Sequence, residues 1–290
     1  MRQIHRIGLI ANPEKARWEA NLRKAAELIH NAKRIPVAPQ LESGSQTTSN
    51  SSFCHHINEV KKTDLILVVG GDGTMLSTAR ALSGVKTPIL GINTGNLGFL
   101  TTAPMANLRH VLATIWKGRF EIQSRPYIEA TITTQGNFTR SIALNDFVIS
   151  RSELSRMIQL NVSVDGEFLT TYQCDGLIVC SPTGSTAYSL SAGGPIVSPN
   201  TEVMTLTPIC PHALSNRSVI VSFKSVIQVE VGIHRPETIL TSDGQVSITL
   251  KPGDTIQFQQ SKHRLHLLSV TGNEFFDTLR QKMKWSGSNV

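Results

Sequence analysis

Residues 65–74 read Leu-Ile-Leu-Val-Val-Gly-Gly-Asp-Gly-Thr, an apolar run that ends in three glycines around one carboxylate. The run is rich in β-branched residues, which predicts a buried strand of the kind found in parallel sheets. Residues 74–83 favour a helix, with Gly84 as its stop. Glycines let backbone N–H groups approach a ligand, and a helix N-terminus attracts phosphate. Asp72 would repel that phosphate unless it holds a cation or handles a proton, so the stretch indicates phosphoryl transfer.

A purely structural turn, in which Asp72 caps the helix, explains the same residues equally well. Two common phosphate-binding loops are excluded. The chain contains no Gly-Lys pair, so it has no Walker A loop. The spacing from Gly71 and Gly73 continues to Leu76, where the dinucleotide fingerprint requires a third glycine.

The composition is that of a folded protein with anionic ligands. With 290 residues, 40% of them hydrophobic and 17% charged, the chain should form about two globular domains. A formal charge of +7 favours anions through the long-range field. The basic residues form no block and alternate with no aromatic pattern, so we expect small phosphorylated ligands and no nucleic acid.

The cysteines and the apolar runs indicate the compartment. The four cysteines are widely separated, which argues against a zinc site and a disulfide scaffold and suits a reducing cytoplasm. The N-terminal apolar run is too short for a signal-peptide core, and no run reaches the length of a membrane span. We therefore expect a cytoplasmic protein without membrane contact.

Strand and helix patterns alternate in the first part of the chain and change to strands alone in the second. Strands are predicted at 7–11, 35–38, 65–69 and 88–92, helices at 18–33, 53–61, 74–83 and 107–116, and a mobile loop at 40–52. This alternation predicts a Rossmann-like parallel sheet with helices on both faces, whose ligands bind beyond the carboxyl ends of the strands. The loop 93–98, Asn-Thr-Gly-Asn-Leu-Gly, should lie there beside the first glycine-rich loop.

The second part predicts an antiparallel, all-β domain. Its strands are expected at 127–134, 140–151, 158–164, 167–172, 219–222, 226–231, 238–250, 255–260 and 265–270, with hairpin turns at Gly136-Asn137, Asp165-Gly166 and Asp243-Gly244. A closing helix at 273–283 should return to the first domain. The expected domains are 1–122 (α/β, phosphate-binding), 123–271 (β-rich, ligand-binding) and 272–290 (C-terminal helix).

Two further groups of polar residues are candidate ligand sites. Asn145 and Asp146 are neighbours, and neighbours on a strand can share a ligand only near a strand end or a bulge. Alone, the pair is better explained as a solvent-exposed strand start. Residues 175–195 run from a buried strand into Pro-Thr-Gly and then a dense series of hydroxyls and small residues. Hydroxyl and amide donors suit sugar hydroxyls and purine edges, so we favour a ligand-binding loop here.

Taken together, the motifs resemble the bacterial NAD kinases (ATP-NAD kinases) in order and spacing. The motifs are Gly70-Gly-Asp-Gly-Thr74, Gly91-Ile-Asn-Thr-Gly-Asn-Leu-Gly-Phe-Leu100, Leu144-Asn-Asp146, the segment 175–195 and Pro208-Ile-Cys-Pro-His212. The first loop is shared with phosphofructokinases and with diacylglycerol and sphingosine kinases. The run Thr183-Gly-Ser-Thr-Ala-Tyr-Ser-Leu-Ser-Ala-Gly-Gly-Pro195 is the specific part, and the likeness extends to Trp285.

This resemblance implies transfer of the γ-phosphoryl group of ATP to the 2′-hydroxyl of the adenosine ribose of NAD, giving NADP, assisted by a divalent metal such as Mg²⁺. Asp72 would be the catalytic base. The residues implied to bind NAD are Asp72, Gly73, Asn145, Asp146, Arg156, Gln173, Asp175, Thr186, Ala187, Tyr188, Ser189, Leu190, Ser191 and Gln245. No protein ligand of the metal is assigned. The family often has glutamate where Asp146 stands and can have a basic residue where Gln173 stands.

The partners implied are NAD, ATP and further copies of the chain, in a dimer or tetramer. Two other functions use the same glycine-rich loop. A lipid or sugar kinase is one, although the hydroxyl-rich run 183–191 argues against a lipid groove. A non-catalytic dinucleotide sensor is the other, although a sensor gains nothing from Asp72 beside phosphates.

Overall fold

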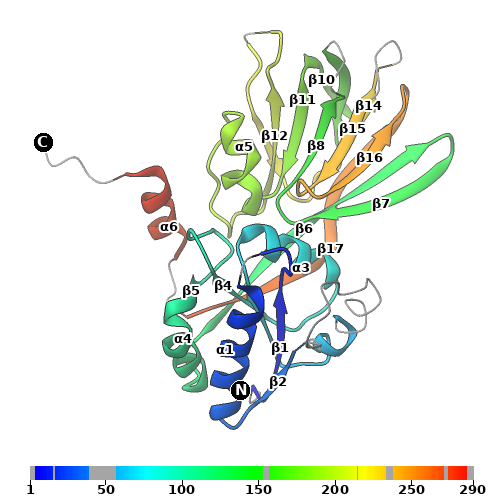
Figure 1. Cartoon of the computed structure of the whole chain (residues 1–290). Coiled ribbons are helices and arrows are strands. Elements are labelled where there is room, and N and C mark those ends of the chain that lie inside the picture. Colours follow the sequence, from blue (N-terminus) through cyan, green and yellow to red (C-terminus); the bar gives the residue numbers. More distant parts are fainter. Residues whose placement is uncertain are drawn as a thin grey trace, which may run out of the picture. The chain divides into compact units, whose positions relative to one another are not determined.

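Figure 1 shows the computed structural model of the chain, which describes residues 4–15, 17–38, 57–152, 157–213, 215–232, 238–270 and 274–285. The chain forms two compact units, Met1–Ser124 with Arg264–Val290, and Arg125–His263. Within the described residues, no helix has both the length and the apolar character needed to cross a membrane. The predicted loop 40–52, Cys54 and the first part of the predicted helix 53–61 lie outside the described residues.

The first unit is built on a parallel sheet. Its strands are β1 (Arg6–Ala11), β2 (Ile35–Val37), β3 (Leu65–Val69) and β4 (Ile89–Asn93), in the order β2-β1-β3-β4. Beyond β4 lie the short strand β5 (Ala103–Pro104) and the end of β17 (Thr255–Ser269), both parallel to β4. All residues of β3 and β4 are buried, as expected of a parallel sheet covered on both faces.

Helices cover both faces of this sheet. Helices α1 (Trp18–Asn31) and α4 (Leu108–Trp116) share a hydrophobic core with alternate residues of β3, such as Leu65 and Leu67. The other residues of β3 and β4 face the opposite side, where α3 (Asp72–Ala81) packs. A Cβ added at Gly91 in β4 would lie 2.7 Å from the backbone carbonyl oxygen of Leu100 and 2.9 Å from the sulfur of Met75 in α3, so this position has room only for glycine. The short 3₁₀ helix η1 (Met105–Asn107) precedes α4. The last helix, α6 (Glu274–Met283), belongs to the same unit, and the ring of its Phe275 lies 6.0 Å from the ring of Phe99, measured between centroids.

The second unit is two antiparallel sheets around one core. One sheet has the order β13-β12-β11-β8-β15-β16, and the other contains β10-β9-β14-β17 with the hairpin β6-β7. The bounds are β6 Glu121–Thr134, β7 Asn137–Ala143, β8 Asp146–Arg151, β9 Ile158–Val164, β10 Glu167–Cys174, β11 Gly176–Cys180, β12 Val203–Ile209, β13 Val219–Ser222, β14 Ile227–Val231, β15 Thr238–Ser242 and β16 Val246–Leu250. Phe147 of one sheet contacts Phe258 of the other, with ring centroids 5.4 Å apart. The predicted fold class, an α/β unit with a parallel sheet followed by an antiparallel β unit and a final helix, is confirmed.

Two of the three predicted hairpin turns form at the predicted residues. Left-handed backbone occurs at Asp165 and Gly166 (φ 52° and 85°) and at Asp243 and Gly244 (φ 49° and 65°). These are the conformations that Asp-Gly hairpin turns require. The third turn lies at residues 135–136, one residue earlier than predicted, and Gly84 has a φ of 83° after helix α3.

Several predicted strands were wrong in their limits. The expected strand 140–151 is broken into β7 and β8. The expected range 238–250 is divided by its predicted Asp243-Gly244 turn into two strands, β15 and β16. The expected pair 255–260 and 265–270 is a single strand, β17, and β12 was not predicted at all. Strand β12 was not recognised because its polar residues Thr205 and Thr207 are buried. The alternation of polar and apolar residues therefore does not distinguish a solvent-facing side from a buried side.

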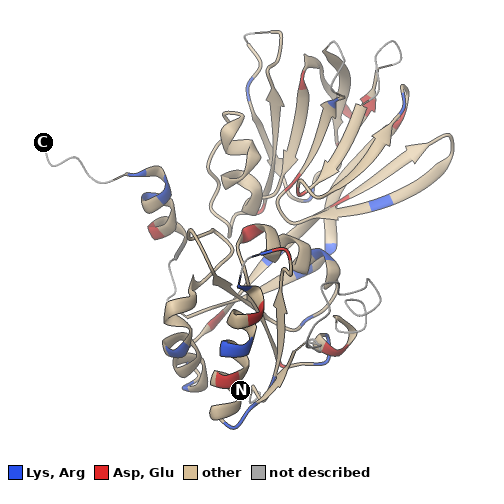
Figure 2. Cartoon of the chain, viewed as in Figure 1, with Lys and Arg blue, Asp and Glu red and all other residues tan. Residues whose placement is uncertain are grey.

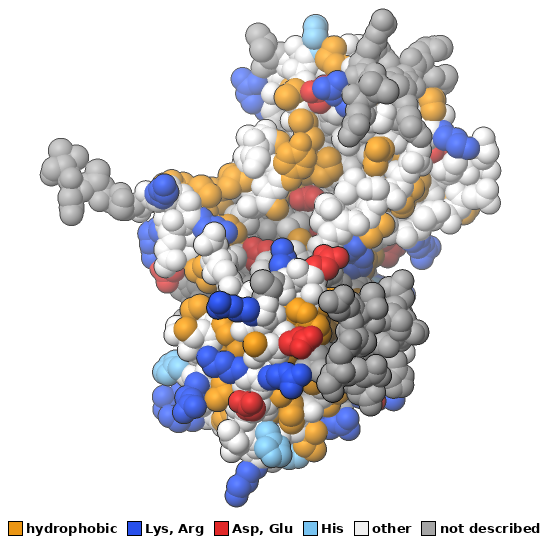
Figure 3. All heavy atoms as spheres, viewed as in Figure 1, with side chains coloured by type: hydrophobic (Ala, Val, Ile, Leu, Met, Phe, Trp, Pro, Cys, Tyr) orange, Lys and Arg blue, Asp and Glu red, His pale blue; other side chains and the backbone are white. Residues whose placement is uncertain are grey.

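The basic residues are distributed over many elements (Figure 2), and on the face of the first unit seen in Figure 3 they alternate with acidic and hydrophobic side chains. No described element carries a continuous run of Lys and Arg. The positive net charge of +7 is therefore spread rather than gathered.

Candidate functional site

The glycine-rich stretch after β3 differs from its prediction in where the helix begins. Helix α3 begins at Asp72, two residues earlier than expected, and Gly71 is its N-cap. The N–H groups of Thr74 and Met75 both donate to the carbonyl oxygen of Gly71, 3.0 and 3.1 Å away. A carboxylate in the first turn is stabilised by the helix dipole, so Asp72 favours a helix that begins here.

The Asp72 carboxylate is held by the second glycine-rich loop. The backbone N–H of Phe99 donates to Oδ2 at 3.0 Å, and that of Leu100 donates to Oδ1 at 3.1 Å. A Cβ added at Gly98 would lie 1.9 Å from Asp72 Oδ1, so only glycine leaves room for the carboxylate. The two loops predicted to lie beside each other at the carboxyl ends of the strands are therefore in direct contact.

A buried amide shapes the second loop. Asn93 is 2% exposed at the end of β4. Its side-chain oxygen accepts the N–H of Gly95 at 2.5 Å, and its side-chain nitrogen donates to the carbonyl oxygen of Asn96. This amide closes the turn that leads to the residues holding Asp72.

The glycines of the first loop have different reasons to be glycine. A Cβ at Gly70 would meet the Thr74 side chain at 2.4 Å, so close packing excludes any larger residue. At Gly71 and Gly73 no described atom lies within 4 Å of an added Cβ, and neither glycine has a left-handed φ. Glycine within a helix costs about 1 kcal/mol relative to alanine. At Gly73 the space for an added methyl group is open, so side-chain packing does not require glycine there.

In the second unit, one carboxylate holds the break between β7 and β8. The N–H of Leu144 donates to Oδ2 of Asp243 at 3.0 Å, and those of Asn145 and Asp146 donate to Oδ1 at 2.7 and 3.3 Å. These N–H groups would otherwise have to pair with a neighbouring strand. The predicted strand 140–151 is interrupted here, and Asn145 and Asp146 lie at the strand end that a shared ligand requires.

Asp146 is a buried carboxyl group with a second carboxylate nearby. It is 4% exposed, and Asp243 is 8% exposed. Burial, and then the negative charge of Asp243, raise the pKa of Asp146 from 3.8 to about 7. Cys180 pairs with Asp146 across the sheet, and burial raises the pKa of its thiol to about 11, so this thiol stays neutral.

The hydroxyl-rich run after β11 divides into internal and exposed side chains. It forms the 3₁₀ helix η2 (Thr183–Thr186) and the short helix α5 (Tyr188–Ser191). Ser185 is fully buried and accepts the N–H of Val197 at 3.0 Å, and buried Ser189 lies 3.1 Å from the hydroxyl of Thr207. The side chains of Thr186, Ala187, Tyr188, Leu190 and Ser191 are at least partly exposed. The buried hydroxyls of Ser185 and Ser189 thus stabilise the turn through hydrogen bonds within the chain. The hydroxyls of Thr186, Tyr188 and Ser191 are at least partly exposed at its surface.

Two buried polar atoms beside this turn have no hydrogen-bond partner among the described residues. They are Oδ1 of Asn145 and Oγ1 of Thr183. The two residues are close, because a Cβ at Gly184 would lie 2.2 Å from the carbonyl oxygen of Asn145. Buried polar atoms almost always have a hydrogen-bond partner from the protein, a ligand or ordered water, so these two atoms are acceptors available for such a contact.

The remaining predicted residues lie elsewhere. Gln245 follows the Asp243 turn and so lies near Asn145 and Asp146. Asp175 directly precedes the first residue of β11, so it lies about 17 Å along the strand from Cys180, the last residue. Its Oδ1 forms an ion pair with Nε of Arg151 at 3.2 Å. Gln173 is exposed and lies on β10, two residues before Asp175. Arg156 lies outside the described residues.

Sequence reasoning missed Asp243 and Thr183 as parts of this site. Asp243 was recognised only as a turn residue, because no local signal shows that its carboxylate reaches residues 97 to 99 positions away. Thr183 stood among many hydroxyls, and only its burial sets it apart.

The comparisons with known proteins identify the family. The ATP-NAD kinase N-terminal domain matches residues 7–120, and the ATP-NAD kinase C-terminal domain matches residues 144–270. The NAD kinase of Moorella thermoacetica is 38% identical over 98% of this chain and 91% of its own length. The chain belongs to the NAD kinase family.

Other NAD kinases agree with this assignment. That of Syntrophotalea carbinolica is 44% identical over 77% of this chain and 78% of its own length. The crystal structure of an NAD kinase from Archaeoglobus fulgidus in complex with ATP superposes with a TM-score of 0.75 at 26% identity, covering 97% of this chain and all of that chain. Yeast NADH kinase complexed with NADH shares the fold, with a TM-score of 0.87 at 24% identity over 99% of this chain and 89% of its own.

Proposed function

We propose that this NAD kinase family member transfers the γ-phosphoryl group of ATP to the 2′-hydroxyl of the adenosine ribose of NAD, giving NADP. The family assignment supports an ATP-dependent phosphotransferase that acts on NAD. The observation that carries the chemistry is Asp72, a carboxylate fixed by two N–H groups between two glycines whose surroundings are open. The functional segments are 1–122 for the phosphates, 123–271 for NAD and 272–290 as the closing helix.

Asp72 is the proposed base. Each of its oxygens accepts one backbone hydrogen bond and keeps further lone-pair capacity for a substrate hydroxyl. Phosphoryl transfer passes through a loose transition state, in which the orientation of the nucleophile matters more than the strength of the base. Asp72 can therefore orient the 2′-hydroxyl and take its proton late in the reaction.

The proposed NAD site centres on Asn145 and Asp146. The unpartnered Oδ1 of Asn145 and Oγ1 of Thr183 are available to hydroxyl or amino donors of the nucleotide. Asp146, with its pKa near 7, can accept or donate a hydrogen bond at neutral pH. The full set of proposed NAD contacts is Asp72, Gly73, Asn145, Asp146, Arg156, Gln173, Asp175, Thr186, Ala187, Tyr188, Ser189, Leu190, Ser191 and Gln245, in which Ser189 acts through the backbone because its hydroxyl is buried against Thr207.

A divalent metal, with Mg²⁺ as the proposed ion, fits these residues only together with a nucleotide. The described residues contain no cluster of three His, Cys, Asp or Glu that could hold a metal alone. Mg²⁺ is commonly bound by one or two carboxylates plus substrate phosphates and water. Asp72 is the carboxylate that would contribute here, and the ion would neutralise charge on the phosphates.

We also propose that the chain is cytoplasmic and acts as a homo-oligomer, a dimer or tetramer, without nucleic-acid or membrane partners. The second unit exposes Phe168 (67%) on β10 and Ile220 (52%) on β13. Exposed apolar side chains on strands suit contact with another copy.

The decisive experiment incubates the purified protein with NAD, ATP and Mg²⁺ and measures NADP with an NADP-specific dehydrogenase. NADP should accumulate in proportion to enzyme and stop when ATP is omitted. Diacylglycerol and sugar phosphates are offered in parallel with labelled ATP. Label in either of them, without NADP formation, would replace this proposal with a lipid or sugar kinase, and tight NAD binding without ATP consumption would indicate a sensor.

A further inference from the structure

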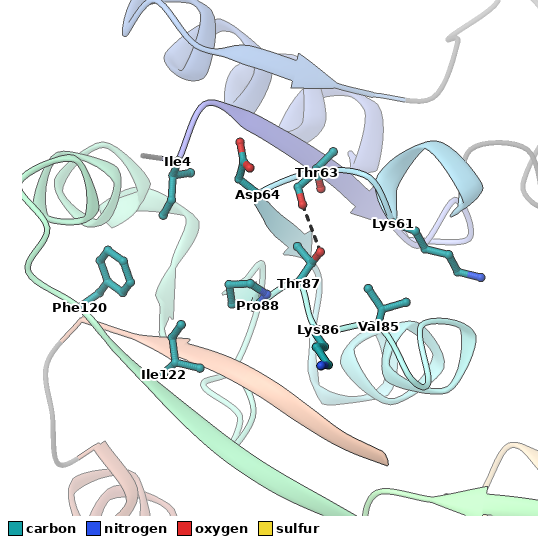
Figure 4. A pocket seen from close by; sticks show the side chains of 10 residues that line it. All are labelled: Ile4, Lys61, Thr63, Asp64, Val85, Lys86, Thr87, Pro88, Phe120 and Ile122. Carbon is teal, nitrogen blue, oxygen red and sulfur yellow. Dashed lines mark hydrogen bonds between the residues drawn. The ribbon is translucent and has the colours of Figure 1, made fainter. Parts of the chain in front are cut away.

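The first unit contains a cavity that the proposed reaction does not use. It has a volume of about 650 Å³ and is lined by Ile4, Lys61, Thr63, Asp64, Val85, Lys86, Thr87, Pro88, Phe120 and Ile122 (Figure 4). This volume lies within the range of small-molecule sites, roughly 300–1,000 Å³.

The cavity lies at the end of the sheet opposite the glycine-rich loops. Thr63 and Asp64 directly precede β3, and Thr87 and Pro88 directly precede β4. Asp72 follows the other end of β3. Each strand has five residues and spans about 16 Å. A ligand in this cavity would therefore occupy a site separate from Asp72.

The walls of the cavity are amphipathic. In Figure 4, Ile4, Phe120 and Ile122 line one side and the lysines 61 and 86 lie at the other, with Pro88 between them. Both lysine side chains are exposed, and neither forms an ion pair with any described residue. The cavity thus combines an apolar wall with two cationic groups.

The other polar groups of the lining already have partners within the chain. The hydroxyl of Thr63 lies 2.7 Å from the carbonyl oxygen of Val60, and that of Thr87 donates to the carbonyl oxygen of Thr63 at 3.1 Å. Oδ2 of Asp64 accepts the N–H groups of His5 and Arg6 at 3.0 and 2.9 Å, which partly offsets its negative charge. The lysine ammonium groups therefore decide the charge preference.

We infer that this cavity is a second ligand site of the protein, which takes a small amphipathic anion. Its ligand has an apolar ring or short chain that lies against Phe120 and Ile122, and one carboxylate, sulfonate or phosphate group that Lys61 and Lys86 bind. Long lysine side chains can reach such a group while their stems extend the apolar wall.

The site is tested with anilinonaphthalene sulfonate, an aromatic anion whose fluorescence rises on binding. The full-length protein is titrated in the presence of saturating NAD and a non-hydrolysable ATP analogue, which fill the proposed nucleotide sites. Binding should persist, weaken with salt, and be displaced by octanoate but not by octylamine. Complete loss of binding on adding the nucleotides would overturn the inference.

Two matched pairs of variants locate the bound probe. Ile122→Glu places a negative charge in the apolar wall at a side chain that is 50% exposed, and Ile35→Glu does the same at 48% exposure on β2, outside the cavity. The first should abolish this binding and the second should not. The double variant Lys61→Gln/Lys86→Gln should weaken binding about tenfold, while Lys62→Gln, next to the cavity but outside its lining, should leave it unchanged.

Equal affinity of the wild type, Ile122→Glu and the lysine double variant would show that the probe binds elsewhere and would refute the site. All these measurements report binding and not turnover. They can therefore fail while NADP formation succeeds, and the reverse holds as well.

Discussion

Asp146 and Asp243 are hydrogen-bonded to each other in both directions, although 97 positions separate them. The N–H of Asp146 donates to Oδ1 of Asp243 at 3.3 Å, and the N–H of Asp243 donates to the carbonyl oxygen of Asp146 at 2.9 Å. The strand break that presents Asn145 is therefore fixed by a distant hairpin turn. The geometry of the proposed NAD site depends on a residue that need not touch NAD.

Asp243→Asn should weaken NAD binding through the backbone of residues 144–146. An amide has one acceptor oxygen, so at least one of the three N–H groups loses its partner, at a cost of about 2 kcal/mol. We expect the KM for NAD to rise about tenfold or more and the KM for ATP to stay within twofold. Steady-state kinetics with each substrate varied measures both values.

The matched control is Asp165→Asn. Asp165 also begins an Asp-Gly turn of the second unit, with a φ of 52°, and accepts the N–H of Val226 at 2.8 Å. Its loss should change stability without changing the KM for NAD. An equal rise of this KM in both variants would mean that the effect is general loosening of the unit.

Asp72→Asn should retain NAD binding and lose most turnover. The amide keeps one acceptor for the N–H groups of Phe99 and Leu100, so the loop should lose about 1–2 kcal/mol of stability and remain folded. We expect kcat to fall about 100-fold or more. Asp254→Asn makes the same change from carboxylate to amide at a buried side chain of the second unit that accepts the Lys251 N–H, so it controls for lost stability alone. Full activity of Asp72→Asn would remove Asp72 from the mechanism.

Gly98→Ala should displace Asp72 without removing it. The new methyl would lie 1.9 Å from Asp72 Oδ1, so the carboxylate must move. We expect kcat to fall as far as in Asp72→Asn. Gly95→Ala in the same loop meets its nearest atom at 4.0 Å and should keep normal turnover. A crystal structure of Gly98→Ala with an unmoved carboxylate would contradict this explanation.

Gly73→Ala should stabilise the protein and weaken nucleotide binding at the same time. Alanine favours a helix over glycine by about 1 kcal/mol, and no described atom obstructs the new methyl group. The melting temperature should rise, while the KM for NAD or ATP rises because the methyl fills the space that the ligand needs. Ser77→Ala, at an exposed position of the same helix, should raise stability alone. Unchanged KM values in Gly73→Ala would show that no ligand approaches this glycine.

The parts of the fold that sequence predicts are those whose causes are local. The apolar run of β3 and the Asp-Gly turns need only neighbouring residues to be recognised. The strand breaks after residue 143 because Asp243 binds the backbone there. Residues 140–151 alone have the pattern of one continuous strand, so the break cannot be predicted from them. The same holds for the site: Asp72 was found from its glycines, but its contact with Phe99 and Leu100 depends on how the two loops fold together.

The stability of the second unit should depend on pH through Asp146. Its pKa of about 7 lies above the unfolded value of 3.8, so the folded chain keeps the proton longer than the unfolded chain. The unfolding free energy should therefore fall as the pH rises from about 4 to about 7 and then level off, by up to about 4 kcal/mol. Asp146→Asn mimics the protonated acid and removes this dependence. Thermal unfolding of both proteins should give similar midpoints only below the unfolded pKa of 3.8, at about pH 3, and a higher midpoint for the variant at pH 8.

Asp165→Asn should show the opposite sign. Hydrogen bonds from Val226 and Ser225 lower the pKa of Asp165, so its contribution is present at neutral pH and lost in acid. That variant should melt below the wild type at pH 8, and the difference should shrink as the pH falls through the lowered pKa. Asp146→Asn could instead melt below the wild type at pH 8. That result would mean that a partner stabilises the ionised Asp146, and it would contradict the inference that burial and Asp243 disfavour its charge.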